Sequence, residues 1–111
     1  LVLTAKKAAL RKEHLREAGI AEDTNLHIYG MEECPEWNKI FIAPREEVRL
    51  EVIAEEVVQT GEKAQGEHPE AGALVLECTD LPPFAAILRK RTGLPVFDFV
   101  TLTEYMHRSL C

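Results

Sequence analysis

The chain has 111 residues, of which 46% are hydrophobic, 29% charged and 6% aromatic, with a formal net charge of -6. These values indicate one soluble globular domain spanning residues 1–111 and exclude two domains. The 19 acidic against 13 basic residues argue against nucleic acid and anionic membranes as partners, because both require a basic surface. No apolar run approaches the ~20 residues of a membrane span, and three unpaired cysteines suit a reducing compartment, so we expect a cytoplasmic protein.

The first part of the chain predicts two short strands separated by a helix. Residues 1–3 and 26–29 are apolar runs of strand type, and residues 6–18 between them are rich in helix formers. Gly19 stands where a left-handed residue ends a helix. Residues 30–42 show no clear period, and we expect a loop with one turn there, in which Trp37 packs against the sheet.

A long amphipathic helix is predicted for the middle of the chain. Apolar residues recur at helical spacing from Leu50 to Val58, Pro44 suits the first turn, and Gly66 marks the end. The glutamates opposite this stripe, Glu56 among them, are expected to form a solvated face.

The last part predicts two more strands with a helix between them. Residues 73–76 are all apolar, as in a strand buried on both faces, and residues 94–97 form the fourth strand. We expect Thr79 or Asp80 to cap the intervening helix, Gly93 to end it, and residues 101–109 to form a short final helix.

This alternation predicts an α/β fold: a three-layer, four-stranded parallel sheet flanked by helices, of the Rossmann-like or flavodoxin-like type. Ligands of such sheets bind at the carboxyl ends of the strands. The polar side chains expected at those ends are Thr4, Glu32, Glu77, Cys78, Thr79, Asp80 and Asp98.

Cys78 is the strongest single candidate for chemistry. It ends a predicted strand directly before a predicted helix, whose dipole would stabilise a thiolate able to act as base or nucleophile. The alternative is a small buried residue that merely ends a strand. We expect Cys34 to be an incidental, half-buried thiol and the terminal Cys111 to have no role.

No cofactor or metal is predicted. The glycines form no phosphate-binding loop, and no Gly-x-Ser-x-Gly elbow is present. The four histidines lie on different predicted elements without the spacing of metal ligands. They are His14, His27, His68 and His107.

The sequence Glu-Cys-Thr-Asp-Leu-Pro-Pro at residues 77–83, preceded by an apolar strand and followed by Gly-Leu-Pro-Val at 93–96, resembles the second half of the aspartate/glutamate/hydantoin racemase superfamily. Residues 1–5, 30–32 and 35–37 are similar to one subgroup of it. The resemblance implies a cofactor-independent, PLP-independent isomerase that moves the α-proton of an aspartate- or glutamate-type substrate between two cysteines.

The resemblance also implies residue roles. Cys78 would be one acid/base group, Thr79 would bind the substrate carboxylate, and the Thr4 hydroxyl would face the site. Glu77 stands where many of these racemases have glycine, and its side chain would either point to the other side of the sheet or alter specificity. Asp80 is a further candidate site residue.

In the racemases, the first cysteine belongs to a preceding lobe. We therefore expect residues 1–111 to form a C-terminal lobe that is inactive alone, with residues 99–111 starting the crossover helix to the missing lobe. The expected partners are a small carboxylate or amino-acid substrate and a second copy or the missing lobe. The alternatives are a single-cysteine enzyme like malonate decarboxylase or maleate isomerase, or a non-catalytic truncated lobe acting as an assembly module.

Overall fold

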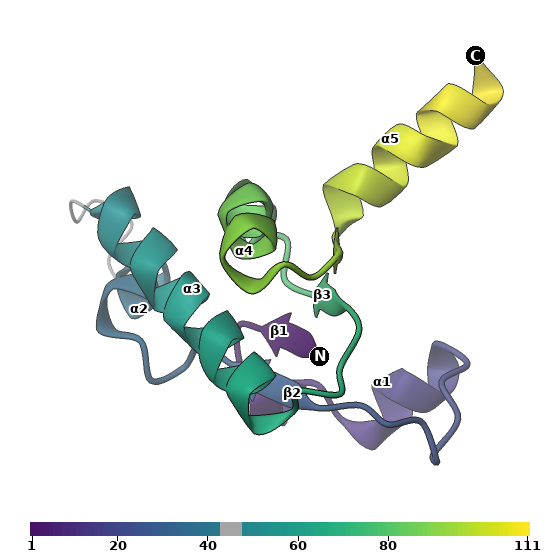
Figure 1. The fold of residues 1–111 in the computed structure, drawn as a ribbon, viewed down its shortest axis with the longest axis horizontal. Helices are drawn as coiled ribbons and strands as arrows, with labels where there is room; N and C mark the ends of the chain where they lie inside the picture. The colour runs from purple at the N-terminus through teal and green to yellow at the C-terminus, as the bar shows by residue number, and fades with distance from the viewer. Residues whose placement is uncertain (43–47) are drawn as a thin grey trace.

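The computed structural model describes residues 1–42 and 48–111. Four parallel strands form one sheet in the order β2-β1-β3-β4, which confirms the predicted α/β fold (Figure 1). The strands are β1 (Val2–Thr4), β2 (Ile28–Gly30), β3 (Leu74–Leu76) and β4 (Val96–Phe97). The central strand β1 pairs with β2 on one side and with β3 on the other, so Leu3 is in register with both Tyr29 and Leu76.

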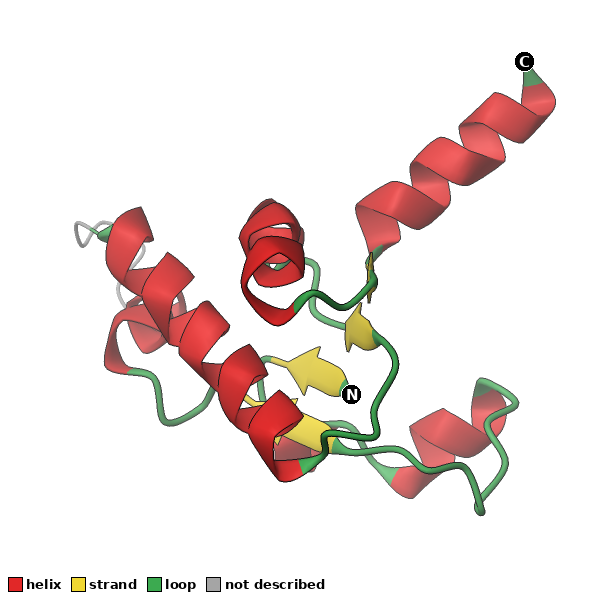
Figure 2. Cartoon of the chain, in the orientation of Figure 1, coloured by secondary structure: helices red, strands yellow, loops and turns green. Residues whose placement is uncertain are grey.

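Helices make up most of the rest of the described chain (Figure 2). The α-helices are α1 (Lys12–Glu17), α2 (Pro35–Ile42), α3 (Leu50–Glu67), α4 (Ala85–Thr92) and α5 (Phe99–Leu110), and short 3-10 turns cover Lys7–Ala9 and Pro82–Phe84. Helix α3 packs against both α2 and α4. Helix α5 extends away from the body of the molecule (Figure 1). None of the helices in the described ranges is both long and apolar enough to cross a bilayer.

The core lies between one face of the sheet and helices α2, α3 and α4. Its fully buried side chains come from alternate strand positions and from the apolar stripe of α3, as the helical spacing predicted. They include Leu3, Leu74, Ile53, Val57, Trp37 and Leu88. Gly61 lets α3 approach α4 closely, because a Cβ there would meet Leu88 Cδ2 at 2.7 Å.

The other face of the sheet is open at β3 and β4. Val75 is 41% exposed and its register partner Phe97 is 55% exposed, since no described helix packs over them. The expectation that residues 73–76 are buried on both faces is therefore wrong for Val75, whereas Leu74 and Leu76 are buried.

Helix α2 is the largest departure from the predicted elements, because residues 30–42 were expected to be mostly loop. The N–H groups of Glu36 and Trp37 donate to the carboxylate of Glu56 on α3, at 3.1 and 2.8 Å. The first N–H groups of this helix are thus hydrogen-bonded by a residue 19–20 positions away. No local capping pattern in the sequence predicts the helix start. Glu56 accordingly does not belong to a purely solvated face. Trp37 packs in the core, as expected.

Smaller differences concern helix ends. The helix predicted for residues 6–18 is broken, because Leu10 and Arg11 adopt extended backbone angles between the first 3-10 turn and α1. The predicted start of the long helix at Pro44 lies outside the described residues. Gly19 has a φ value of 79°, which confirms the predicted left-handed helix end, and Gly93, with φ 72°, ends α4 as predicted.

Candidate functional site

Thr4 and Glu77 meet at the carboxyl ends of β1 and β3. The Thr4 hydroxyl donates to Glu77 Oε2 at 2.7 Å, and the Glu77 N–H donates to the carbonyl of Leu3 at 2.9 Å. Thr4 is 3% exposed, whereas Glu77 is exposed. Both side chains lie on the open face of the sheet, because Glu77 follows Val75 by two residues along the strand direction. Two of the predicted site residues therefore contact each other directly.

Cys78 is half-buried and packs against the core. Burial raises the pKa of its thiol, and the charges of Asp80 and Glu77 raise it further, while a hydrogen bond from the Asp80 backbone N–H to the sulfur lowers it. The net direction is upward, so in the ligand-free chain the thiol form is favoured.

The expected helix dipole does not act on Cys78. The Leu81 N–H donates to the Cys78 carbonyl, a 3-10 turn follows, and α4 begins only at Ala85. A helix dipole is felt only within the first turn, so the expected lowering of the thiol pKa is absent. Thr79 and Asp80 do not cap this helix either, since neither the 3-10 turn nor α4 has a side-chain cap. Both residues remain exposed at the same edge as Cys78.

A groove of about 630 Å³ runs beside Glu77 along the open face of the sheet. Its walls carry three aromatic rings and two carboxylates, from Phe97, Phe99, Tyr105, Glu77 and Asp98. Asp98 is 8% exposed and its Oδ1 accepts the Thr101 N–H at 2.7 Å, which caps α5. Aromatic faces together with the exposed carboxylate of Glu77 favour a cationic ligand with apolar substituents.

The sequence analysis did not predict the aromatic groove. The signal was the alternation Phe97, Asp98, Phe99, which places an acidic cap between two exposed aromatic residues. Recognising it required knowing that α5 begins at Phe99 rather than at 101 and that β4 has an open face.

A second, smaller hollow of about 290 Å³ lies on the other side of Glu77. Thr4, Leu10 and His14 help to line it. His14 Nδ1 accepts the Arg11 N–H at 3.0 Å within the turn that opens α1. Glu77 therefore separates two hollows and faces solvent in both.

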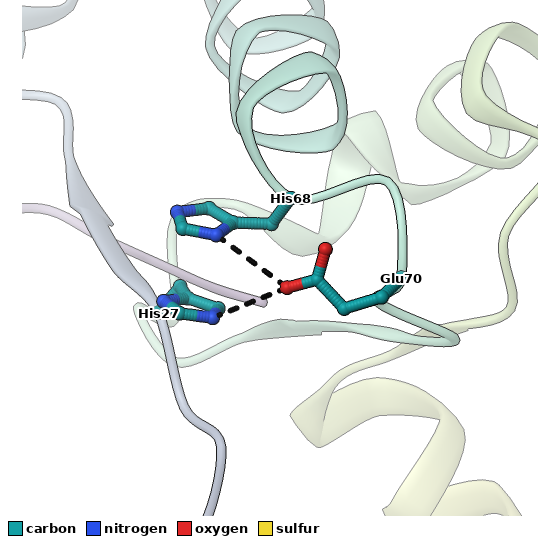
Figure 3. Close-up of side chains that lie close together, drawn as sticks. All are labelled: His27, His68 and Glu70. Atoms are coloured by element: carbon teal, nitrogen blue, oxygen red, sulfur yellow. Dashed lines mark ion pairs between the residues drawn. The ribbon is translucent and has the colours of Figure 1, made fainter.

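The remaining cysteines and histidines lie in different parts of the structure. Cys34 is half-buried, as expected, and burial raises its pKa. Cys111 lies 3.8 Å from the His107 ring on α5. His27 and His68 lie on different elements, as the sequence indicated, but their rings stack beside Glu70, which the sequence did not predict (Figure 3). The chain pattern could not show this, because 41 residues separate the two histidines.

Curated proteins similar to this chain are named dimethylsulfoniopropionate lyases. One from Durusdinium sp. clade D is 36% identical over 67 residues, which are 60% of this chain and 22% of that protein. Dimethylsulfoniopropionate lyase 5 of Emiliania huxleyi is 31% identical over 113 residues, covering 96% of this chain and 22% of the relative. Lyase 3 of the same alga is 31% identical over 100 residues, covering 86% of this chain and 26% of the relative.

The chain thus spans about a quarter of the length of the curated relatives it matches. No family model and no solved structure matches it.

These names correct the function implied by the racemase resemblance. The relatives are named as lyases, so the racemase family, the isomerase activity, and the decarboxylase, maleate isomerase and assembly-module alternatives are all wrong. The physical reason is that a thiol and a hydroxyl at a strand end serve any reaction that moves a proton beside a carboxylate. That turn alone does not specify which bond breaks afterwards.

Proposed function

We propose that this chain acts as a lyase on dimethylsulfoniopropionate, in contrast to the expectation that it is inactive alone. The observation that carries the proposal is the similarity to dimethylsulfoniopropionate lyase 5, which extends over 96% of the chain and includes the Cys78 turn. The substrate has a dimethylsulfonium cation at one end, a carboxylate at the other, and two methylene groups between them. It is a small carboxylate, the substrate class that the sequence predicted.

The reaction that this substrate allows is a β-elimination. A base takes a proton from the carbon next to the carboxylate, and the electron pair of that C–H bond becomes the second bond of the new carbon–carbon double bond. The carbon–sulfur bond breaks, and its electron pair leaves with sulfur. The products are acrylate, neutral dimethyl sulfide and the proton on the base, which passes to solvent.

The aromatic groove supports binding of the sulfonium end. A sulfonium carries a positive charge spread over apolar methyl groups, which is the kind of ligand that aromatic faces and a carboxylate hold. Glu77 supplies a charge whose one oxygen is fixed by Thr4 and whose side chain is otherwise exposed to solvent. Phe97 and Tyr105 supply exposed ring faces in the same groove.

We assign the proton-transfer step to Cys78, which follows Glu77 at the end of β3 but does not itself line the groove. Burial raises the pKa of its thiol most, and a sulfonium cation bound beside Glu77 would offset the smaller contributions of the Asp80 and Glu77 charges. Substrate binding would therefore lower the pKa of the thiol and favour the thiolate that removes the proton. We assign the exposed Thr79 hydroxyl, on the same turn, to the substrate carboxylate.

Helix α5 presents an exposed apolar surface that suits packing against another polypeptide. Its exposed apolar side chains include Leu102, Met106 and Leu110. We propose that this helix packs against a second copy of the chain or another lobe, as residues 99–111 led us to expect. Sedimentation equilibrium tests this: a species heavier than the monomer is expected, and a monomer at high concentration would contradict it.

The activity is tested by incubating the full chain with dimethylsulfoniopropionate and following dimethyl sulfide by gas chromatography and acrylate by NMR. Equal amounts of both products are expected, lost in Cys78→Ser and retained in Cys34→Ser. Cys34 is the matched control because it is also half-buried, and burial raises its pKa too. Products that survive Cys78→Ser would overturn the role of Cys78.

Binding is tested separately with an analogue that lacks the sulfonium charge. In 4-methylpentanoate, carbon replaces the sulfonium sulfur, so the two ligands share a shape and differ in charge. NMR titration of the full chain should show tighter binding of dimethylsulfoniopropionate, with shifts at Glu77 and Phe97. Equal affinities would overturn sulfonium recognition, and absence of both binding and product would overturn the proposed function.

A further inference from the structure

His27, His68 and Glu70 place three ligand atoms around one point (Figure 3). The two imidazole rings stack with centroids 3.4 Å apart and an interplanar angle of 11°. His27 Nε2 and His68 Nδ1 each lie 3.6 Å from the same oxygen, Glu70 Oε1. The candidate ligand atoms of all three residues lie within 4.8 Å of one another.

These distances suit a shared metal ion better than hydrogen bonds. A nitrogen–oxygen separation of 3.6 Å is too long for a good hydrogen bond. At a tetrahedral zinc ion with bonds of ~2.0–2.1 Å, two ligand atoms lie about 3.3 Å apart. Each nitrogen–oxygen pair would have to shorten by a few tenths of an ångström, and the two stacked imidazole rings would have to turn so that both lone pairs face one ion.

His27 supplies a second, independent observation. Its Nε2 atom is buried and finds no hydrogen-bond partner among the residues that the structure describes. A buried polar atom without a partner is costly, and native structures generally satisfy such atoms. Protonation of His27 would provide only a long ion pair to a carboxylate that is 54% exposed, which is a weak interaction. A metal ion would satisfy the same lone pair directly.

The position of the three residues separates them from the proposed lyase site. His27 directly precedes β2, His68 directly follows α3, and Glu70 lies in the connection to β3. They are therefore at the amino ends of the parallel strands, opposite the edge that carries Glu77 and Cys78. An ion held there would join the start of β2 to the end of α3, which lie far apart in the sequence.

We propose that His27, His68 and Glu70 bind a divalent ion of the zinc class, which would join the start of β2 to the end of α3. Two imidazoles and one carboxylate are ligands that zinc favours, and they leave one position for water. The neighbouring Tyr29 ring lies edge-on to His68 at 6.1 Å, and the Tyr29 hydroxyl donates to Glu67 at 2.6 Å. This contact limits the rotation of His68 and keeps Glu67 engaged outside the cluster.

The test uses the full chain after treatment with a chelator. Zinc chloride should raise the midpoint of thermal unfolding by several degrees, because an ion that binds only the folded state stabilises it. Cobalt(II) should give visible absorption bands typical of a tetrahedral site without a thiolate charge-transfer band. Both signals should be lost in His68→Gln and His27→Gln and weakened in Glu70→Gln.

The matched control removes another pair of possible ligands, one histidine and one cysteine. The double variant His107→Gln, Cys111→Ser eliminates the close contact on α5 and should leave both metal signals intact. Loss of the signals in this double variant, or a thiolate band with cobalt, would overturn the proposed site, as would the absence of any thermal shift. Dimethylsulfoniopropionate binding is measured on the same samples, so failure of the metal site and failure of the lyase proposal remain distinguishable.

Discussion

The Thr4 hydroxyl donates a 2.7 Å hydrogen bond to Glu77 Oε2 and thereby joins the carboxyl ends of β1 and β3. Thr4 is buried, so one Glu77 oxygen is held while the rest of the carboxylate faces the aromatic groove. The same Glu77 side chain therefore stabilises the edge of the sheet and carries the negative charge that we propose binds the sulfonium ion.

Replacing Glu77 by Gln should weaken sulfonium binding without disrupting the fold. The amide keeps an oxygen that can accept from Thr4 but removes the charge, so affinity for dimethylsulfoniopropionate should fall about tenfold, ~1.4 kcal/mol. The affinity for 4-methylpentanoate should not fall. Isothermal titration calorimetry measures both, and Glu17→Gln, on exposed α1, should change neither. Equal losses for both ligands would show that the charge is not what Glu77 contributes.

Thr4→Val should lower the free energy of unfolding by about 1 kcal/mol, the net value of a typical hydrogen bond. The two side chains have similar volumes, so the change isolates the hydroxyl. Urea unfolding followed by circular dichroism measures it. Thr79→Val is the matched control, because Thr79 is exposed and its loss should cost little stability. Equal losses for the two variants would contradict a special role for the buried threonine.

Asp80→Asn should make Cys78 more reactive at neutral pH. The Asp80 charge raises the pKa of the Cys78 thiol, and the substitution removes that charge while keeping the backbone N–H that donates to the sulfur. The midpoint of the alkylation rate against pH, read at Cys78 by mass spectrometry, should therefore move to lower pH. The midpoint for Cys34, in the same samples, should stay in place. An unchanged Cys78 profile would show that the Asp80 charge does not raise the pKa of this thiol.

Glu36 should make the fold sensitive to acid. Hydrogen bonds from the Arg49 N–H and Lys39 hold its pKa below the ordinary value, and its side chain is only 5% exposed. Its stabilisation is therefore complete above the ordinary glutamate pKa and is lost as pH falls through the lowered folded value. Unfolding free energies between about pH 7 and pH 2 should decline less steeply in Glu36→Gln than in the native chain. Glu33→Gln, at an exposed neighbouring position, should leave the slope unchanged.

Two glycines of α3 should respond in opposite directions to alanine. Gly66→Ala adds a Cβ in open space and should stabilise the helix by roughly 0.5–1 kcal/mol. Gly61→Ala places its Cβ 2.7 Å from Leu88 Cδ2, inside the buried contact between α3 and α4, so it should destabilise the fold. Thermal unfolding distinguishes them. Stabilisation by both substitutions would mean that Leu88 moves to accommodate the added methyl group at little cost.

The sequence predicted the parallel sheet and the long helix because local patterns govern both. The apolar stripe of α3 and the apolar run of β3 are visible within a few residues, and Gly19 and Gly93 mark helix ends by themselves. Helix α2 escaped prediction because Glu56, from a different helix, satisfies its first N–H groups. Such a nonlocal cap has no local signature.

The candidate site was predictable in part for the same reason. Strand ends converge in a parallel sheet, so Thr4, Glu77 and Cys78 could be placed at one edge before the structure was known. The state of the Cys78 thiol depended on where α4 begins, and the approach of His27 to His68 depended on the end of α3. The turn motif around Cys78 does not distinguish a racemase from a lyase.

The most direct measurement is dimethyl sulfide release by the full chain from dimethylsulfoniopropionate deuterated at the carbon next to the carboxylate. If Cys78 removes that proton in the slow step, release should be several-fold slower than from the unlabelled substrate and should be lost in Cys78→Ser. Release at the rate of a protein-free blank, or release that persists in Cys78→Ser, would contradict the account.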